Sequence, residues 1–255
     1  MIELKTPTEI EAMREAGRVV ANTLAAVRAA ARPGVSLLEL DEVAAAVIAD
    51  AGAKPAFLHY HPSFAPSPFP GTICTSVNDA IVHGVPNDYR VADGDLVSID
   101  SAAVLDGWSG DAAVSFVVGA ADPADLELID TTTRALRAGI AAAQPGNRLG
   151  DIANAIGVVA REARYGIMEG YGGHGIGRTM HEDPHVANEG RAGRGMRLRP
   201  GLTLAIEPML TRGGKDSYIT DADGWTLRTV DGTRAAHVEH TVAVTEDGPV
   251  VLTLP

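Results

Sequence analysis

The 255-residue sequence lacks the features of secreted and membrane-spanning proteins. Cys74 is the only cysteine, so no intramolecular disulfide can form, which is typical of a reducing compartment. No run of 18 apolar residues is present, and the first residues, MIELKTPTEIEAMREAG, contain no apolar signal segment. We therefore expect a cytoplasmic protein that crosses no membrane.

Positive charge is also scarce. Lysine and arginine number 21 against 33 aspartates and glutamates, which gives a formal net charge of -12. Such a balance argues against a protein that coats nucleic acid through basic patches, and we expect no nucleic-acid partner. With 45% hydrophobic residues the chain can bury a sizeable core.

Helix-start signals organise the first part of the chain. Thr6-Pro7-Thr8-Glu9 is a capping box with proline at the first helical position, and it predicts a long helix that ends by residues 32–34. A second capping box, Ser36 to Glu39, predicts a helix that stops near Gly52. After a predicted loop over residues 53–72, the sequence predicts strands at 73–77, 96–100 and 112–118, then helices at 123–143 and 149–164.

These patterns recur in the second half of the chain. Pro33-Gly34 before one helix matches Pro145-Gly146 before another, residues 94–100 match 201–207, and residues 111–117 match 239–245. Chance similarity of short apolar strings is the alternative, but three matches in the same order make it the weaker reading. We expect an α+β fold in which residues 1–255 form a single domain of two similar halves, roughly 1–120 and 121–255.

The repeat places four carboxylates at equivalent positions. Asp100 matches Glu207 and Asp111 matches Glu239, each at the predicted end of an apolar strand. Taken alone, each of these acids is best explained as a side chain that faces solvent at the end of a strand. Four acids that converge between two halves would repel one another unless multivalent cations neutralise them. The sequence therefore predicts a metal site at the seam between the halves.

His174 is the candidate nitrogen ligand of this site. It lies in Gly170-Tyr-Gly-Gly-His-Gly-Ile-Gly177, where glycines let the backbone approach whatever the imidazole binds. A nitrogen ligand favours Mn, Fe, Co or Zn over Mg or Ca. Without the carboxylates, a loop histidine with a structural hydrogen bond is an equally good interpretation.

Two other motifs in this region are not supported. Residues 170–175 fit G-x-G-x-x-G, but they open no convincing helix, as a dinucleotide site requires. Residues 181–185 fit H-E-x-x-H, but Pro184 would disrupt the helical turn on which both histidines must lie.

Several motifs together resemble the type I methionine aminopeptidases, and the resemblance covers nearly the whole chain. They are Asn78-Asp-Ala-Ile-Val-His83-Gly-Val-Pro, Ser98-Ile-Asp100, Gly110-Asp111, Gly173-His174-Gly-Ile-Gly-Arg-Thr-Met-His181-Glu-Asp-Pro, Ile206-Glu207-Pro and His237-Val-Glu239-His-Thr. The resemblance implies a pita-bread fold, with pseudo-two-fold symmetry and a metal site between the halves. It implies removal of the initiator methionine from nascent proteins when the second residue is small.

The resemblance also implies a role for each site residue. Asp100 chelates one divalent ion, His174 and Glu207 hold a second, and Asp111 and Glu239 bridge both; the ions are Co, Mn, Fe(II), Zn or Ni. Glu207 is the general base, while His83 and His181 contact the substrate at the reacting amide. The methionine pocket is lined by Tyr60, Phe69, Cys74, Met180 and Trp225. Nascent N-termini are the implied partner, with the ribosome as a further candidate, and a monomer is expected.

The sequence departs from the family at the pocket mouth. Phe57 stands where a small residue or cysteine is usual, extra residues lie between Tyr60 and Cys74, and Ser109 precedes the Gly110-Asp111 pair. The nearest rival functions are a proline-specific peptidase, which generally carries an extra N-terminal domain for which this chain has no room, and a catalytically inactive peptide-binding protein. All five predicted ligands are present, which disfavours the inactive protein.

Overall fold

The computed structural model describes residues 2–63 and 65–255. In this part of the chain the helices are α1 (Pro7–Ala30), α2 (Leu37–Asp50), α3 (Pro123–Ala142) and α4 (Leu149–Glu162). The strands are β1 (Lys54–Pro55), β2 (Cys74–Val77), β3 (Ala80–Val82), β4 (Leu96–Leu105), β5 (Trp108–Val117), β6 (Gly166–Ile167), β7 (Gly172–Gly175), β8 (Glu182–Ala187), β9 (Thr203–Ile206), β10 (Met209–Thr211), β11 (Tyr218–Thr220), β12 (Leu227–Thr229), β13 (Ala235–His237), β14 (Glu239–Thr245) and β15 (Gly248–Val251).

Both predicted capping boxes are confirmed. The Thr6 side chain accepts a hydrogen bond from the Glu9 amide, and the Glu9 carboxylate accepts one from the Thr6 amide at 2.8 Å. Ser36 and Glu39 make the same reciprocal pair at the start of α2. These bonds satisfy amide groups that the first turn of a helix leaves without partners.

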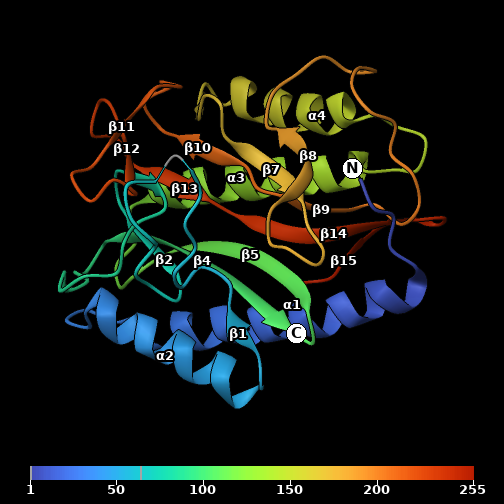
Figure 1. Cartoon of the computed structure of the whole chain (residues 1–255). Helices are drawn as coiled ribbons and strands as arrows, with labels where there is room; N and C mark the ends of the chain where they lie inside the picture. Colours follow the sequence, from blue (N-terminus) through green and yellow to red (C-terminus); the bar gives the residue numbers. More distant parts are fainter. Residues whose placement is uncertain (1, 64) are drawn as a thin grey trace.

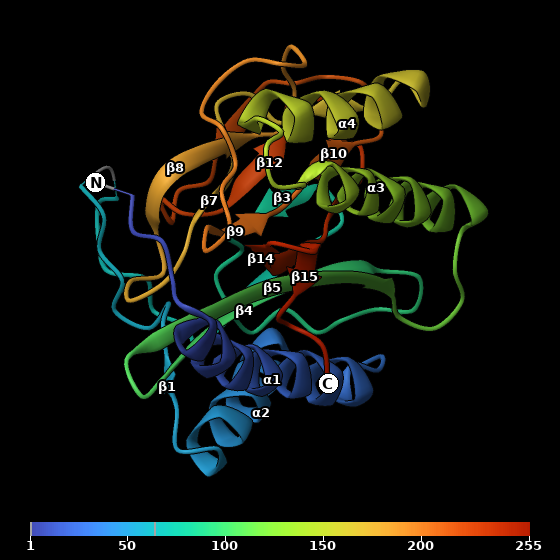
Figure 2. The same cartoon turned by 90° about the vertical axis from the view of Figure 1, so that its right-hand side faces the viewer.

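One sheet crosses both halves of the chain, with the order β1-β4-β5-β14-β9-β7-β8, β2 beside β4 and β15 beside β14. The helix pair α1 and α2 lies on one side of its strands and the pair α3 and α4 lies on the other, as Figures 1 and 2 show from two directions. The pairing of β5 with β14 joins the halves at the centre of the sheet.

Each helix pair covers its own apolar cluster. Leu40, Val97 and Ile99 are among the buried residues beneath α1 and α2, whereas Ile152, Ile156 and many others form a larger cluster beneath α3 and α4. The central strands lie between these two apolar clusters, and this packing holds their polar side chains in fixed positions. No helix in the described residues is both long and apolar enough to cross a membrane.

The prediction that all four carboxylates stand at strand ends is wrong for Asp100 and Asp111. Both lie inside ten-residue strands, β4 and β5, which form a hairpin. The turn is Asp106-Gly107, both with positive φ, which suits a tight connection between antiparallel strands. The small and apolar residues between Asp100 and this turn extend the strand beyond the acid. Glu207 directly follows β9 and Glu239 begins β14, as expected.

The loop predicted over residues 53–72 is largely present, with the addition of β1, which pairs with β4. The two motifs set aside on sequence grounds lie on strands β7 and β8. Neither therefore has the helix that a dinucleotide site or an H-E-x-x-H zinc site requires.

Candidate metal centre and substrate pocket

Strand register brings the predicted ligands to one face of the sheet. Ala113 of β5 lies opposite Asp100 of β4 on one side and opposite Glu239 of β14 on the other. Directly paired residues of antiparallel strands point to the same face, and so do residues two apart on one strand. Asp111, two residues from Ala113, therefore shares a face with both acids.

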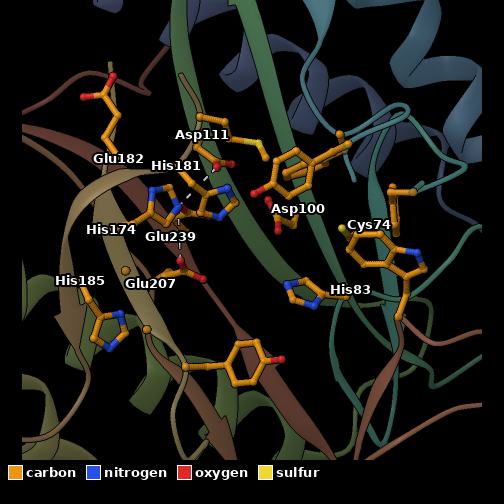
Figure 3. A pocket seen from close by; sticks show the side chains of 18 of the residues that line it. Cys74, His83, Asp100, Asp111, His174, His181, Glu182, His185, Glu207 and Glu239 are labelled. Atoms are coloured by element: carbon orange, nitrogen blue, oxygen red, sulfur yellow. Dashed lines mark ion pairs between the residues drawn. The ribbon is translucent and has the colours of Figure 1, made fainter. Parts of the chain in front are cut away.

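The same argument extends to the remaining two ligands. His240 pairs with Ile206, so the register places Glu239 next to Glu207, just beyond the end of β9. His174 of β7 pairs with Ala205, which is two residues before Glu207. All five predicted ligands consequently converge on one point, and Figure 3 shows them around the same pocket.

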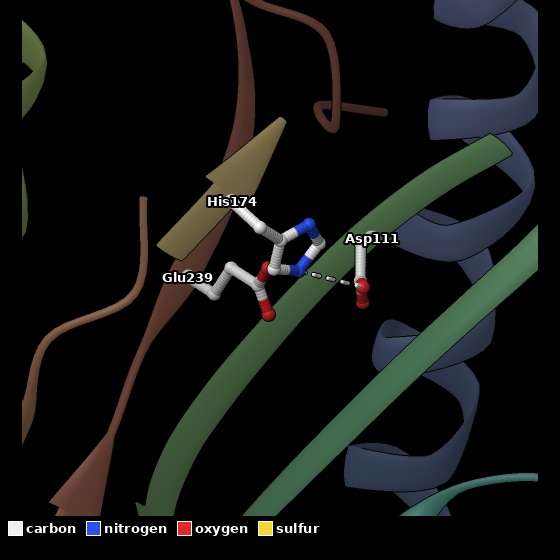
Figure 4. Close-up of side chains that lie close together, drawn as sticks. All are labelled: Asp111, His174 and Glu239. Carbon is white, nitrogen blue, oxygen red and sulfur yellow. Dashed lines mark ion pairs between the residues drawn. The ribbon is translucent and has the colours of Figure 1, made fainter. Parts of the chain in front are cut away.

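The distances within this group are those of a ligand cluster. His174 Nε2 lies 3.6 Å from Glu207 Oε1 and 3.9 Å from Asp111 Oδ2. Figure 4 shows the His174 ring directed between Asp111 and Glu239, and ligand atoms of these three residues lie within 4.8 Å of one another. Donor atoms about 2.1 Å from one ion lie about 3–4 Å apart, so these separations fit a shared cation.

Burial makes the four carboxylates costly in the absence of a cation. Burial, together with the neighbouring acids, raises the pKa of Asp111 and of Glu239 well above the ordinary range. Burial also raises the pKa of Asp100 to about 7 and that of Glu207 to about 8. Ionised together, four such groups require positive charge between them.

The imidazole of His174 is prepared to bind a metal. Its Nδ1 lies 2.9 Å from the Gly175 carbonyl oxygen, which can only accept a hydrogen bond. Nδ1 therefore carries the proton, and Nε2 presents its lone pair to the carboxylates. Burial lowers the pKa of His174 to about 3, so the ring is neutral at physiological pH, as a metal ligand must be.

The described residues contain buried side-chain polar atoms without hydrogen-bond partners, and their positions indicate whether a metal would fit the site. Of the seven such side-chain atoms in the described residues, four belong to this cluster: Asp100 Oδ1, Asp111 Oδ1, His237 Nε2 and Glu239 Oε1. Buried polar groups are nearly always satisfied, so this concentration marks missing partners at one place. Oxygen and nitrogen donors in such a group fit a divalent cation.

A pocket of about 370 Å³ contains the ligand cluster and an apolar end. Its lining includes every residue that the sequence analysis assigned to the site: Tyr60, Phe69, Cys74, His83, Asp100, Asp111, His174, Met180, His181, Glu207, Trp225 and Glu239. One end is a packed cluster in which Phe69 meets Trp225 edge-on, with ring centroids 5.1 Å apart. The ligands form the other end.

Two histidines lie between the pocket and the ligands. The centroid of the His181 ring lies 4.1 Å from that of His174. The same ring stacks on Tyr60, with centroids 5.4 Å apart. The His83 ring makes edge-to-face contacts with Tyr171 and Trp225, with ring centroids 5.8 and 6.2 Å apart. His83 has a φ of 58°, a left-handed conformation that histidine adopts more readily than most residues.

Sequence reasoning gave no role to three residues near the centre. Tyr171 and His185 line the pocket, as does Phe57, which the sequence had placed at the pocket mouth, and His237 lies 3.3 Å from Glu207. His237 carries a usable signal, since a histidine two residues before a ligand in an apolar run is hard to explain as a surface residue. The positions of Tyr171 and His185 in the pocket depend on the pairing of β7 with β8, which no local sequence pattern reveals.

This fold and this cluster of carboxylates and imidazole define a metallopeptidase. Residues 11–246 match the model of metallopeptidase family M24, and the chain belongs to that family. The methionine aminopeptidase 1 of Mycobacterium tuberculosis (strain CDC 1551 / Oshkosh) is 55% identical over 261 residues, covering 100% of this chain and 96% of that protein.

Solved structures agree with this assignment. The methionine aminopeptidase of Rickettsia prowazekii has a TM-score of 0.95 and 38% identity, with 100% of both chains covered. The prolidase of Pyrococcus furiosus has a TM-score of 0.79 at 23% identity, which covers 99% of this chain and 65% of that one and shows the fold alone. The expected pita-bread fold is confirmed, and the family and the ligand cluster support a divalent metal.

Proposed function

We propose that this chain is a metal-dependent aminopeptidase that removes the N-terminal methionine from nascent proteins and peptides whose second residue is small. The observation that carries the proposal is the convergence of five buried or half-buried metal-ligand side chains in a pocket of about 370 Å³ that has an apolar end. The 55% identity to a methionine aminopeptidase supports methionine as the residue removed.

Two divalent ions are proposed, drawn from Co, Mn, Fe(II), Zn or Ni. Asp100 would hold one ion, His174 and Glu207 the other, and Asp111 and Glu239 both. When bound, the ions would supply Lewis acidity, which lowers the pKa of a coordinated water and polarises a carbonyl. The convergence of four carboxylates with raised pKa values on one sheet face supports bound cations that neutralise them.

Glu207, His83 and His181 are the proposed catalytic residues. Glu207 lies in the ligand cluster, and its carboxylate, kept ionised by bound cations, would accept a proton from the attacking water and pass it on. His181, beside His174, would donate a hydrogen bond to the carbonyl oxygen. Burial lowers the pKa of His83 to about 4, so its neutral ring would contact the leaving nitrogen through an N–H or a lone pair.

Tyr60, Phe69, Cys74, Met180 and Trp225 are proposed to bind the methionine side chain. Phe69, Cys74, Met180 and Trp225 belong to one buried cluster, with Tyr60 packed against it. Aromatic rings and sulfur atoms make favourable contacts with a thioether, so the cluster suits methionine better than a charged side chain. Phe57, which meets Phe69 edge-on at 6.2 Å, would narrow the pocket.

We further propose that residues 1–255 form a single catalytic domain that acts as a monomer in the cytoplasm. The sheet that runs through both halves supports one domain. Nascent polypeptide N-termini are the proposed partner, and the ribosome is a candidate contact. The net charge of -12 argues against nucleic-acid binding by the chain itself.

Hydrolysis of a peptide panel by metal-loaded protein tests the function. Met-Ala-Ser and Met-Gly peptides should be cut. Met-Lys and Met-Phe peptides should not be cut, because their large second residue would lie at the end of the pocket that the metal ligands form. A proline-specific peptidase would instead cleave bonds next to proline and ignore Met-Ala-Ser. Binding without turnover by metal-loaded protein would indicate a non-catalytic peptide-binding protein, and either result overturns the proposal.

A further inference from the structure

His237 is held at the metal centre by its backbone. Strand β13 pairs with β10 so that His237 lies opposite Met209, two residues beyond Glu207. The hydroxyl of Ser115 accepts a hydrogen bond from the His237 amide at 3.0 Å and lies 2.7 Å from the His237 carbonyl oxygen, to which it donates. The position of the imidazole is thus determined by two strands and a buried serine.

The side chain of His237 is directed at Glu207. Its Nε2 lies 3.3 Å from Glu207 Oε2, while the other oxygen of the same carboxylate faces His174 Nε2 at 3.6 Å. The Glu207 carboxylate therefore lies between two imidazole nitrogens. His237 is 2% exposed, and its Nε2 has no hydrogen-bond partner in the described residues.

The spacing matches that of two donors on one ion. Donor atoms about 2.0–2.2 Å from a cation and roughly 90–110° apart are separated by about 2.9–3.6 Å. Ligand atoms of Glu207, His237 and Glu239 all lie within 4.8 Å of one another, as do those of Asp111, His174 and Glu239. Glu239 belongs to both groups, and each group contains one imidazole.

We propose that His237 Nε2 is a sixth protein ligand of the metal centre, on the opposite side of Glu207 from His174. The inference rests on the metal centre of the proposed function and adds to its five ligands. The centre would then have two imidazoles among its donors. A second nitrogen donor shifts the centre further from Mg or Ca and toward Zn, Co or Fe(II).

Proton NMR of the Co(II)-loaded protein counts coordinated histidines directly. A histidine bound to Co(II) through Nε2 shows its Nδ1 proton as a strongly shifted, solvent-exchangeable resonance. The parent protein should show two such resonances, and His237→Ala should lose one. His185→Ala is the matched control, since the His185 side chain lines the pocket, is exposed and belongs to neither ligand group, and both resonances should remain.

Calorimetric titration of metal-free protein with Co(II) gives a second readout. Loss of the ligand should weaken binding of at least one ion by about 10-fold or more, since even outer partners of ligands are worth 10–100-fold. His237→Gln keeps a side chain that can hydrogen-bond Glu207, and it should show the same weakening. If both variants fail to fold, the number of shifted resonances in the parent still decides the question.

A single shifted resonance in the parent overturns the proposal and makes His237 a hydrogen-bond partner of Glu207. Unchanged Co(II) affinity in His237→Gln overturns it as well. Both results leave the proposed function intact, because Co(II) still binds. Failure of the parent to bind Co(II) at all would contradict the proposed function itself.

Discussion

Lys5 Nζ lies 2.8 Å from Glu182 Oε2, so the segment that precedes α1 is bonded to the residue that follows His181. The Lys5 side chain is 2% exposed, and that of Glu182 is 20% exposed. The other Glu182 oxygen accepts a hydrogen bond from the Thr179 amide. This pair therefore fastens the loop that carries Met180 and His181 into the pocket.

Replacing Lys5 with methionine should reduce both stability and turnover. The half-buried Glu182 carboxylate would lose its charged partner, at a cost of about 1 kcal/mol or more, and the loop with His181 would lose its anchor. Metal content should stay unchanged, because Lys5 contacts none of the proposed ligands. Urea unfolding, metal analysis and kcat on one preparation measure these effects.

Arg18→Met is the matched control for this prediction. Arg18 pairs with Glu15 at 2.7 Å on α1, but both side chains are about half exposed. Exposed pairs contribute about 0–1 kcal/mol, so this variant should behave almost like the parent. Equal effects of the two substitutions would show that the Lys5 pair has no special role.

The Lys5–Glu182 pair also illustrates what the sequence could not predict. Its partners are 177 residues apart, and nothing local to either residue indicates the contact. The capping boxes were predictable because their bonds span three residues. The convergence of Asp100 with Glu207 was predictable because an internal repeat supplied long-range information. For His237 the sequence offered only its place two residues before a ligand in an apolar run, and its contact with Glu207 depends on the β10–β13 register and on Ser115.

Glu207→Gln should keep the fold and lose nearly all turnover. The amide cannot accept a proton and is a weaker ligand, so kcat should fall by at least about 10²–10⁴. Circular dichroism and kcat with Met-Ala-Ser check the two parts. Hydrolysis close to the parental rate in a variant of confirmed sequence would mean that Glu207 is not the base.

The metal-free protein should lose stability as pH rises above 6.5. Burial raises the pKa of Glu207 from 4.5 to about 8, so the folded state binds the carboxyl proton more tightly than the unfolded state does. The stability that this proton gives the folded state is therefore lost as pH rises toward 8. Burial lowers the pKa of His83 and His174 from 6.5, which acts in the opposite direction but only below 6.5. Between pH 6.5 and 8 the carboxylates therefore determine the slope.

Thermal midpoints at pH 6.5 and pH 8 measure this effect. Metal-free parent protein should melt lower at pH 8, by the equivalent of about 1 kcal/mol or more. Metal-free Glu207→Gln should show a smaller decrease, and metal-loaded protein should show little. A midpoint of the metal-free parent that rises over this interval would contradict the assignment of buried, protonated carboxyl groups.

His83→Asn should lower kcat without removing metal. Asparagine adopts the positive φ of position 83 more readily than alanine, so the fold should be kept. If the imidazole assists the leaving nitrogen, kcat should fall by about 10²–10⁴ while KM changes less. A normal kcat combined with a lower thermal midpoint would assign His83 a structural role.

Metal removal and restoration, followed by turnover, tests the central claim most directly. Metal-free protein, verified by elemental analysis, should not hydrolyse Met-Ala-Ser, because four buried carboxylates and one imidazole are arranged to hold cations. Stepwise addition of Mn, Co or Fe(II) should restore hydrolysis and saturate with bound metal. Full activity in verified metal-free protein would contradict the account.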